Sequence, residues 1–309
     1  MRQYLFRRLR RGLITLWLTT LAVFLLMRVI GNPIDFLSLP EMTLADRERM
    51  KEEHGLNKPL YVQYVLFNKS IFTGDFGKSV RWGRRDAFDV YISRLPATVQ
   101  LVGSALIFAM VLGLAFGVVS ATRPNSVADR IVKVLAITGQ SMPAFWLGLL
   151  LILLFTIYLG WLPSAGGPDR VGLKGLIMPA VSLGWFQVAA NARLVRSSML
   201  DALESDYIKS VQAKGMPRRT VIWKHALKNA SLPVITLFAV NFALLLGGAV
   251  VTEAIFAWPG IGRLLVDSIF ARDYTVVQTV VFFSATIIVV VNIVVDLCYA
   301  WLDPRVTLE

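Results

Sequence analysis

The sequence predicts an all-α integral membrane protein with six transmembrane helices and a long extracytoplasmic segment between the first two. Of its 309 residues, 56% are hydrophobic and only 17% are charged, whereas charged residues make up about a quarter of a soluble globular domain. Six apolar runs follow one another along the chain, and each is long enough for the roughly 20 residues that a spanning helix needs. The runs cover residues 12–30, 98–121, 134–162, 176–195, 232–257 and 275–302.

The first 30 residues are expected to form a cytoplasmic amino terminus and an uncleaved first span. Five arginines lie among the first eleven residues and precede the first apolar run. The alternative, a cleaved leader, would end in small residues in an A-x-A arrangement, and this run is followed by none. Because six spans return the chain to its starting side, residues 303–309 are expected to be a cytoplasmic tail.

Residues 31–95 are polar and are expected to lie outside the cytoplasm, before a transmembrane core over residues 96–302. They include ten basic and nine acidic residues, so their charges nearly cancel. A short surface helix is expected over residues 44–54, and an amphipathic segment along the membrane interface over residues 59–72. The stretch GDFGKS ends like a phosphate-binding loop, but Phe72 stands where that loop requires glycine. We therefore expect the chain to have no ATP site of its own.

The distribution of basic residues predicts which side each loop faces. With the amino terminus inside, the inner segments hold the five starting arginines, three basic residues between positions 123 and 133, and eight between Arg193 and Lys228. The two short outer loops hold only two basic residues each, as the positive-inside rule expects. We therefore attribute the formal net charge of +12 to orientation beside anionic lipid head groups, and expect no nucleic-acid partner.

Two features of the membrane core are expected to depart from straight spanning helices. Pro143 lies inside the third apolar run, where proline removes a backbone donor and clashes with the preceding turn, so this span is expected to be kinked or broken. The alternative is that neighbouring helices simply tolerate the bend. The outer segments WLPSAG and AWPGIG are expected to be re-entrant or interfacial elements near the mouth of a path. They supply Trp161, Pro163, Trp258 and Pro259, which are candidates for a gate or a contact with a partner protein, and both tryptophans suit the aromatic belt of a membrane surface.

The inner loop over residues 198–231 is predicted to be a rigid helix–turn–helix. Hydrophobic residues recur at helical spacing on both sides of a break at Gly215 and Pro217, because glycine frees the backbone and proline starts a new helix. A mobile loop would not keep an amphipathic pattern on both sides of a break. This loop is therefore expected to present a surface to a partner protein. The alternative is a solvated basic loop that serves only topology.

Polar residues inside the apolar runs are candidates for function, because a charge at the bilayer centre costs about 3 kcal/mol. Glu253 and Asp296 are the ionisable candidates. The amides expected to face a translocation path are Gln187, Asn191, Asn241 and Asn292. The alternative role for each amide is to hold membrane helices together.

The residue types that build metal or catalytic sites are scarce. Cys298 is the single cysteine, and His54 and His225 lie far apart in the sequence, which disfavours a metal site. An intramembrane enzyme would need paired aspartates or a serine with a histidine inside the spans, and Asp296 has no obvious partner there. A stand-alone secondary transporter is the other rival, but such proteins are often built from repeats, and the sequence shows no internal repeat.

The stretches DYIKSVQAKG and HALKNASLP, on either side of the break, look like the cytoplasmic loop of ATP-binding-cassette importer permeases of the dipeptide, oligopeptide and nickel branch. In the wider superfamily this loop reads E-A-A, three residues, glycine, nine residues, then I-x-L-P. Gly215 is kept, whereas Lys209, Ser210 and Val211 stand at the E-A-A positions and HALK replaces I-x-L-P. Other stretches that resemble the family, in the family's order, are HGLNKPLYVQY, GDFGKSV, RLPATVQL, SMPAFWLGL, WLPSAG, FAWPGIGRLLVDSIFARDY and DLCYAWLDPRV.

The resemblance implies a permease subunit in the bacterial inner membrane that binds no cofactor and catalyses no reaction. Its partners would be a second homologous permease, two cytoplasmic ATPases that use ATP and Mg, and an extracytoplasmic substrate-binding protein, which the outer segments would contact. The cargo would be di- or oligopeptides, with nickel chelates or glutathione-like molecules as the alternative, moved by alternating access. The segment over residues 206–215 would be the coupling helix that sits in an ATPase groove. Residues assigned to this coupling are Asp206, Tyr207, Ala213, Lys214, Gly215, Pro217 and His225.

Overall fold

A computed structural model describes residues 2–30, 45, 48 and 57–302 of the chain. This part of the protein is built from helices, with one isolated bridge between Lys78 and Asp86, so the all-α prediction is confirmed for it. Most of the short helix expected over residues 44–54, and the tail over residues 303–309, lie outside the described residues. The chain divides into two compact units, residues 1–96 with 260–309 and residues 97–259.

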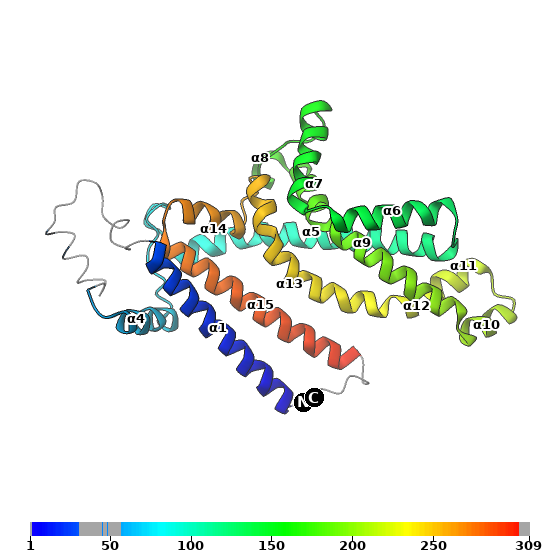
Figure 1. The fold of residues 1–309 in the computed structure, drawn as a ribbon, viewed down its shortest axis with the longest axis horizontal. Coiled ribbons are helices and arrows are strands. Elements are labelled where there is room, and N and C mark those ends of the chain that lie inside the picture. The colour runs from blue at the N-terminus through cyan, green and yellow to red at the C-terminus, as the bar shows by residue number, and fades with distance from the viewer. Residues whose placement is uncertain (1, 31–44, 46–47, 49–56, 303–309) are drawn as a thin grey trace. The chain divides into compact units, whose positions relative to one another are not determined.

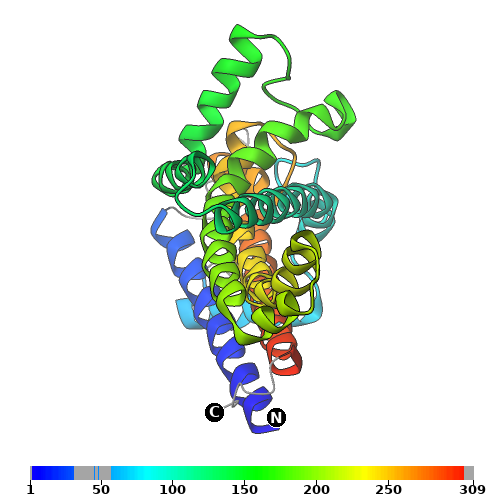
Figure 2. The same cartoon turned by 90° about the vertical axis from the view of Figure 1, so that its right-hand side faces the viewer.

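In the first unit, helix α1 (Arg2–Ile30) and helix α15 (Tyr274–Leu302) lie side by side and antiparallel, as both views show (Figure 1 and Figure 2). A Cβ atom on Gly12 of α1 would lie only 2.7 Å from Cγ1 of Val289. Because small residues let two membrane helices approach closely, Gly12 fixes the separation of this pair.

Helix α4 (Leu60–Thr73) packs on α1 through aromatic side chains. The ring centroids of Tyr64 and Phe67 lie 5.3 Å and 6.0 Å from that of Phe24. The helix ends at Gly74, whose φ of 74° accepts the left-handed turn that glycine adopts without strain. The amphipathic segment expected over residues 59–72 is therefore a helix, and its place at the membrane interface stays a prediction.

The buried carboxylate of Asp273 holds residues 79–81 beside the start of α15. Asp273, which is fully buried, accepts hydrogen bonds from the Ser79 hydroxyl and from the backbone N–H groups of Val80 and Arg81, at 3.0 Å and 3.2 Å. Asp273 also precedes α15 and accepts from the Val276 N–H at 3.3 Å. The serine of the GKS stretch therefore binds a residue of the fold. Beside it, helix α14 (Ile261–Phe270) packs in an apolar cluster with the start of helix α5 (Ala87–Thr122) and with α15.

In the second unit, helices α6 (Val127–Ser141) and α7 (Ala144–Leu151) form a bent pair. The two parts meet at an angle of 108°, and Figure 1 shows α7 turning away from the direction of α6. Pro143 between them is extended, with φ −61° and ψ 139°. The predicted break at Pro143 is therefore confirmed. Helix α7 continues as a π-helical segment, η1 (Ile152–Tyr158), which the sequence pattern does not predict.

Helices α5 and α9 (Lys174–Glu204) approach closely over a G-x-x-x-G pattern made by Gly113 and Gly117. A Cβ atom on Gly113 would lie 2.5 Å from Cβ of Asn191, and one on Gly117 would lie 2.4 Å from Cβ of Val195. Small residues at this spacing let membrane helices pack backbone to backbone. Helices α6, α7 and α13 (Leu232–Ile255) also pack on α9.

By length and apolar composition, three described helical segments are able to cross a membrane, and the bent pair of α6 and α7 would make a fourth. The three segments are Phe6–Leu26, Ala87–Thr122 and Tyr274–Val295. The fourth and fifth apolar runs are also helical, as α9 and α13. Helix α9 includes amides and arginines that lower its apolar character. The count of six spans therefore stays a prediction.

Candidate docking site

The loop over residues 198–231 contains a short helix, a tight turn and a second helical segment. Helix α10 (Asp206–Ala213) begins after Ser205, whose hydroxyl oxygen accepts from the Ile208 N–H at 3.4 Å. Gly215 has a φ of 76°, a left-handed conformation that other residues adopt only with strain. Pro217 then precedes the chain's next helical stretch. The predicted helix–turn–helix, with its break at Gly215 and Pro217, is confirmed.

The second arm of the loop consists of three short segments in direct succession. They are α11 (Arg218–Thr220), a π-helix η2 (Val221–Ala226) and α12 (Leu227–Ala230). A π-helix is rare and often lies at functional sites. The chain then enters α13 directly, as the sequence predicted for the start of the fifth run.

An apolar cluster fixes this loop to the ends of two long helices. Ile208 and Val211 of α10 are 0% and 7% exposed. They pack with residues of α5, α9 and the second arm of the loop, namely Val118, Ala121, Val195, Met199, Val221, Ala226 and Ala230. Burial of several aliphatic side chains contributes about 1.5–3 kcal/mol each. The loop is therefore a packed part of the second unit and can move with it as a rigid body.

The opposite face of α10 is open to a partner. Tyr207 is 52% exposed, and its hydroxyl lies 2.7 Å from Nδ1 of His225 on η2. Lys209 and Asp206 form an exposed ion pair at 2.9 Å, within one turn of the helix. The structure thus brings Tyr207 and His225 together. The remaining residues predicted for coupling are exposed along the same helix and turn, namely Asp206, Ala213, Lys214, Gly215 and Pro217.

A cavity of about 440 Å³ lies between α10, the second arm of the loop and the end of α5. Gln212, Met216, Ile222 and Thr122 contribute to its wall. Arg218 also lines it and donates from Nη2 to the carbonyl oxygen of Thr122, at 3.1 Å. This bond ties the second arm of the loop to the last residue of α5. The loop and α5 are thus joined by polar as well as apolar contacts.

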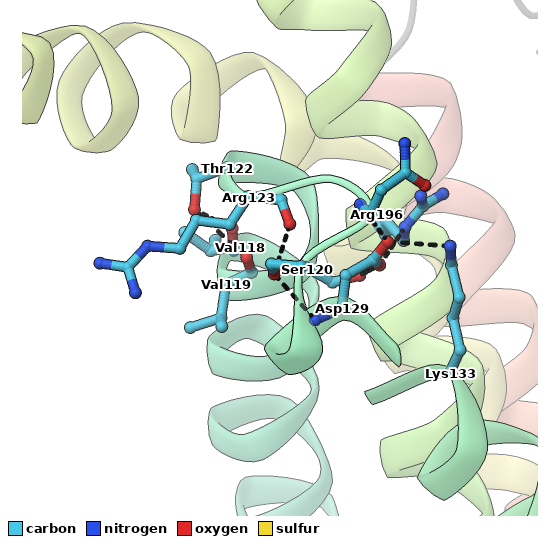
Figure 3. Close-up of polar contacts among 10 residues, drawn as sticks. Val118, Val119, Ser120, Thr122, Arg123, Asp129, Lys133 and Arg196 are labelled. Atoms are coloured by element: carbon cyan, nitrogen blue, oxygen red, sulfur yellow. Dashed lines mark hydrogen bonds and ion pairs between the residues drawn. The ribbon is translucent and has the colours of Figure 1, made fainter. Parts of the chain in front are cut away.

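A second buried carboxylate, Asp129, lies near this loop, and its sequence context does not predict its burial. It is on the first turn of α6 and is buried, with 0% of its surface accessible. Its oxygens accept from Ser120 on α5, Arg196 on α9, Lys133 on α6 and the Asn125 N–H (Figure 3). The only signal in the sequence is an acidic residue within an otherwise basic connection.

The structure places the candidate polar residues of the membrane helices in different surroundings. Gln187, Asn191 and Asn241 are buried, each 5% exposed, whereas Asn292 is exposed. Asn191 donates from Nδ2 to the carbonyl oxygen of Ala109 on α5, at 3.3 Å. This contact joins two helices, and the expectation that these amides face a path stays a prediction.

Glu253, one of the two ionisable candidates, is buried on α13. Glu253 is 0% exposed and accepts from the Thr98 hydroxyl at 2.6 Å, so it joins α13 to α5 within the second unit. A buried carboxylate needs such donors, because removal from water disfavours its charge. The side chain of Asp296 lies outside the described residues.

The two outer segments rich in tryptophan, glycine and proline pack on each other. The Gly166 N–H donates to the carbonyl oxygen of Phe256 at 3.2 Å, and a Cβ atom on Gly167 would lie 2.5 Å from Cγ of Pro259. Trp161 is 66% exposed, but Trp258 is 0% exposed and donates from Nε1 to the Ala97 carbonyl oxygen at 2.8 Å. The aromatic-belt expectation for Trp258 is wrong in this unit, because its ring is enclosed. A role of Trp161, Pro163, Trp258 and Pro259 at a gate or partner contact stays a prediction.

Replacing Trp258 with phenylalanine is expected to lower the free energy of unfolding by about 2 kcal/mol, because it removes the hydrogen bond to Ala97 and leaves a cavity. Thermal unfolding of the purified protein in detergent measures this change. Trp161→Phe is the matched control, and a substitution at so exposed a site is expected to change the free energy by less than about 0.5 kcal/mol. Equal effects of the two substitutions would contradict the structural role of Trp258.

Within the described residues, no group of three or more histidine, cysteine, aspartate or glutamate side chains is placed to bind a metal ion. The loop geometry instead offers a rigid, partly basic surface for a protein partner.

Comparison with known proteins identifies relatives over nearly the whole chain. Residues 113–308 match the family described as binding-protein-dependent transport system inner membrane component. The chain is 39% identical over 316 residues to oligopeptide transport system permease protein AppB of Bacillus subtilis (strain 168), covering 99% of each chain. It is 37% identical over 307 residues to glutathione transport system permease protein GsiC of Escherichia coli (strain K12), again covering 99% of each.

A solved structure of the MetNI methionine ABC transporter, in an inward-facing conformation, has the same fold as the core of this chain. The TM-score is 0.57 at 20% sequence identity, and the match covers 70% of this chain and 97% of that one. At this identity, the likeness shows the fold alone.

Proposed function

This chain belongs to the family of binding-protein-dependent transport system inner membrane components, and we propose that it is the permease subunit of an ATP-driven peptide importer. Membership of the family confirms the resemblance found in the sequence. The observation that carries the proposal is the docking turn, by which we mean residues 205–230: a rigid helix–turn–helix with one face buried and the other exposed. The relative named as an oligopeptide permease supports peptides as the cargo.

In the proposed topology, six helices span the bacterial inner membrane and both termini lie in the cytoplasm. The antiparallel pair of α1 and α15 supports this, because the first residues of α1 and the last residues of α15 then lie at the same end. The basic residues of the starting segment and of the docking turn lie on cytoplasmic segments in this topology. Residues 31–95 would lie on the outer side, where a substrate-binding protein delivers cargo.

The mechanism follows from the rigidity of the docking turn. Two partner ATPases would bind and hydrolyse ATP with Mg and close on each other, while this chain contributes no catalytic group. Their closure would displace α10, and the packed cluster beneath α10 would carry that displacement into α5 and α9. Rigid-body movement of packed helices is a common basis of alternating access. A second homologous permease would complete the path.

Co-purification tests the proposal. When this chain is expressed with candidate ATPases and a second permease encoded by the same organism, the ATPases are expected to co-purify with it, and the reconstituted complex to hydrolyse ATP faster when the loaded binding protein is added. A stand-alone secondary transporter would instead transport substrate as a pure chain driven by an ion gradient. Transport by the purified chain alone would therefore overturn the proposal.

A second cargo class is supported by the relative named as a glutathione permease, which is 37% identical. Glutathione-like molecules and peptides share amide groups and terminal charges, so one pore is able to serve both. Uptake of labelled oligopeptides, glutathione and nickel chelates by the reconstituted complex, each with its candidate binding protein, separates these cargoes. The nickel alternative rests on the sequence resemblance only.

Charge reversal at Lys209 is expected to weaken ATPase association about fivefold, because the docking turn holds six lysines and arginines against one aspartate and so suits an acidic groove. Association is measured as a dissociation constant at two salt concentrations, and the difference between Lys209→Glu and the unmodified chain is expected to shrink at high salt. Lys174→Glu, on the predicted outer side, is the matched control and should leave the constant unchanged. Tighter binding of Lys209→Glu would contradict an acidic groove.

A further inference from the structure

The Asp129 junction is a polar cluster in which the buried Asp129 contacts the buried Ser120 and the more exposed Asn125, Lys133 and Arg196 (Figure 3). One carboxylate oxygen accepts from the Ser120 hydroxyl and from Nε of Arg196, at 3.0 Å for the arginine. The other oxygen accepts from the Asn125 N–H at 2.9 Å and from Nζ of Lys133 at 2.8 Å. A carboxylate without exposed surface is stable only when such partners replace its water. Here the partners come from three helices and from the connection between α5 and α6, which contains Asn125.

The junction and the docking turn use neighbouring residues of the same helices. On α5, Ser120 lies between Val118 and Ala121, which pack beneath α10. On α9, Arg196 directly follows Val195, which packs in the same cluster. Arg218 adds a bond from the turn to the end of α5. The docking turn is therefore fixed to α5 and α9 at the level of the junction.

Helix α6 is joined to α5 and α9 by contacts other than the apolar cluster beneath α10. The cluster beneath α10 includes residues of α5, α9 and the docking turn, and α6 contributes none of its described side chains. Near its other end α6 packs on α9, where a Cβ atom on Gly139 would lie 2.8 Å from Nε1 of Trp185. At its first turn, the Asp129 junction joins α6 to both α5 and α9. Helix α6 then leads to the 108° break before α7.

We infer that Asp129 is a positioning residue that makes the first turn of α6 move together with α5 and α9 when a partner displaces the docking turn. This inference rests on the proposed function, because it needs an ATPase to move the turn. Without the junction, α6 would stay packed on α9 near its break and joined to α5 through residues 123–126, but its first turn would lose the side-chain contacts that hold it to both helices. ATP hydrolysis by the complex would then continue while transport per ATP falls.

The side chains that bind the Asp129 carboxylate offer a matched set of substitutions. Arg196→Gln removes the charged link between α6 and α9, and Ser120→Ala removes the hydroxyl link between α6 and α5. Lys133→Gln removes a charge from the same carboxylate, but Lys133 lies on the same helix as Asp129, four residues away, so it joins no two helices. A purely electrostatic or folding role predicts similar effects for Lys133 and Arg196, whereas a linking role does not.

The experiment reconstitutes the whole complex, with ATPases and binding protein, and measures substrate transported per ATP hydrolysed. We expect Arg196→Gln to lower this ratio about fivefold or more, in the range of ordinary coupling between sites, with ATPase association retained. Ser120→Ala is expected to lower it in the same direction, and Lys133→Gln to lower it less than either. Labelled oligopeptide is the transported probe.

Any other outcome overturns either the proposed function or the inference about Asp129. If the unmodified complex does not assemble with ATPases, the proposed function fails. If it assembles and transports but Arg196→Gln keeps the ratio, or Lys133→Gln lowers it as much, the inference about Asp129 fails and the proposed function stands. If Arg196→Gln is not recovered as folded protein, the single-hydroxyl deletion Ser120→Ala decides, and an unchanged ratio in that variant overturns the inference.

Discussion

Replacing Gly117 with valine is expected to prevent most of the protein from folding. A Cβ atom at this position would lie 2.4 Å from Cβ of Val195 and 2.9 Å from the backbone oxygen of Ala192. Because a backbone oxygen is unable to move aside as a flexible side chain does, α5 and α9 would have to separate. Overpacking of this kind is expected to lower the free energy of unfolding by about 3 kcal/mol or more.

The measurement is the yield of monodisperse protein in detergent, followed by thermal unfolding. Gly103 on the same helix is the control, because a Cβ atom there would have no neighbour within 4 Å. Gly103→Ala is expected to be neutral or to stabilise the protein by up to about 1 kcal/mol, since alanine favours the helix. Normal yield and unfolding temperature for Gly117→Val would show that the two helices do not depend on their close approach.

Replacing Gly215 with valine is expected to abolish most uptake while the protein still folds. A Cβ atom at Gly215 would have no neighbour within 4 Å, so no clash arises, but its φ of 76° lies in the left-handed region. That conformation costs an L-residue about 1–2 kcal/mol, and a β-branched residue adopts it rarely. The strain falls on the docking turn alone, so it disfavours the conformation that binds the ATPase. Each 1.4 kcal/mol of such strain lowers the equilibrium constant for binding about tenfold.

Uptake by the reconstituted complex is expected to fall about tenfold or more for Gly215→Val, with normal yield of the membrane protein and weaker ATPase association. Gly215→Asn is the matched control, because asparagine tolerates the left-handed conformation better than other non-glycine residues. It should keep most of the uptake. Equal uptake by the valine and asparagine variants would show that the turn conformation at Gly215 is not needed for docking.

The helices that the apolar runs predicted were found, but their ends were not. Helix α5 begins at Ala87, before the apolar run that starts near residue 98, and α9 extends to Glu204, beyond a run that ends near residue 195. Hydropathy detects only the part of a helix that suits hydrocarbon. A helix continues into water wherever its backbone and caps allow, and apolar content carries no signal for that part.

The docking turn was predictable because its signals are local. Gly215 and Pro217 act on their own backbone, and the hydrophobic spacing beside them needs no distant partner. Asp129 was not predictable for the opposite reason. Its partner Arg196 lies 67 positions away, and a lone acid between basic residues resembles an exposed residue until the fold brings α5, α6 and α9 together.

The burial of Trp258 was also unpredictable, because it depends on a contact with a residue 161 positions away. A tryptophan beside proline and glycine at the end of an apolar run suits a membrane surface. Its burial depends on the Ala97 carbonyl oxygen, which the fold places 2.8 Å away. The π-helical segment η1 also had no signal, because ILLFTIY is apolar on almost every side and has no polar face whose shift would reveal a wider turn.

The antiparallel pairing of α1 and α15 places Arg2 and Leu302 at neighbouring helix ends. The first helix starts where the last helix finishes, and the two are neighbours within one compact unit. A flexible linker between Arg2 and Leu302 would therefore have to bridge only adjacent helix ends and would not have to cross the bilayer. Chains with adjacent termini tolerate circular permutation. The order in which the helices are synthesised is thus separable from the contacts that they make, and a permuted gene is a means of studying how such a protein inserts.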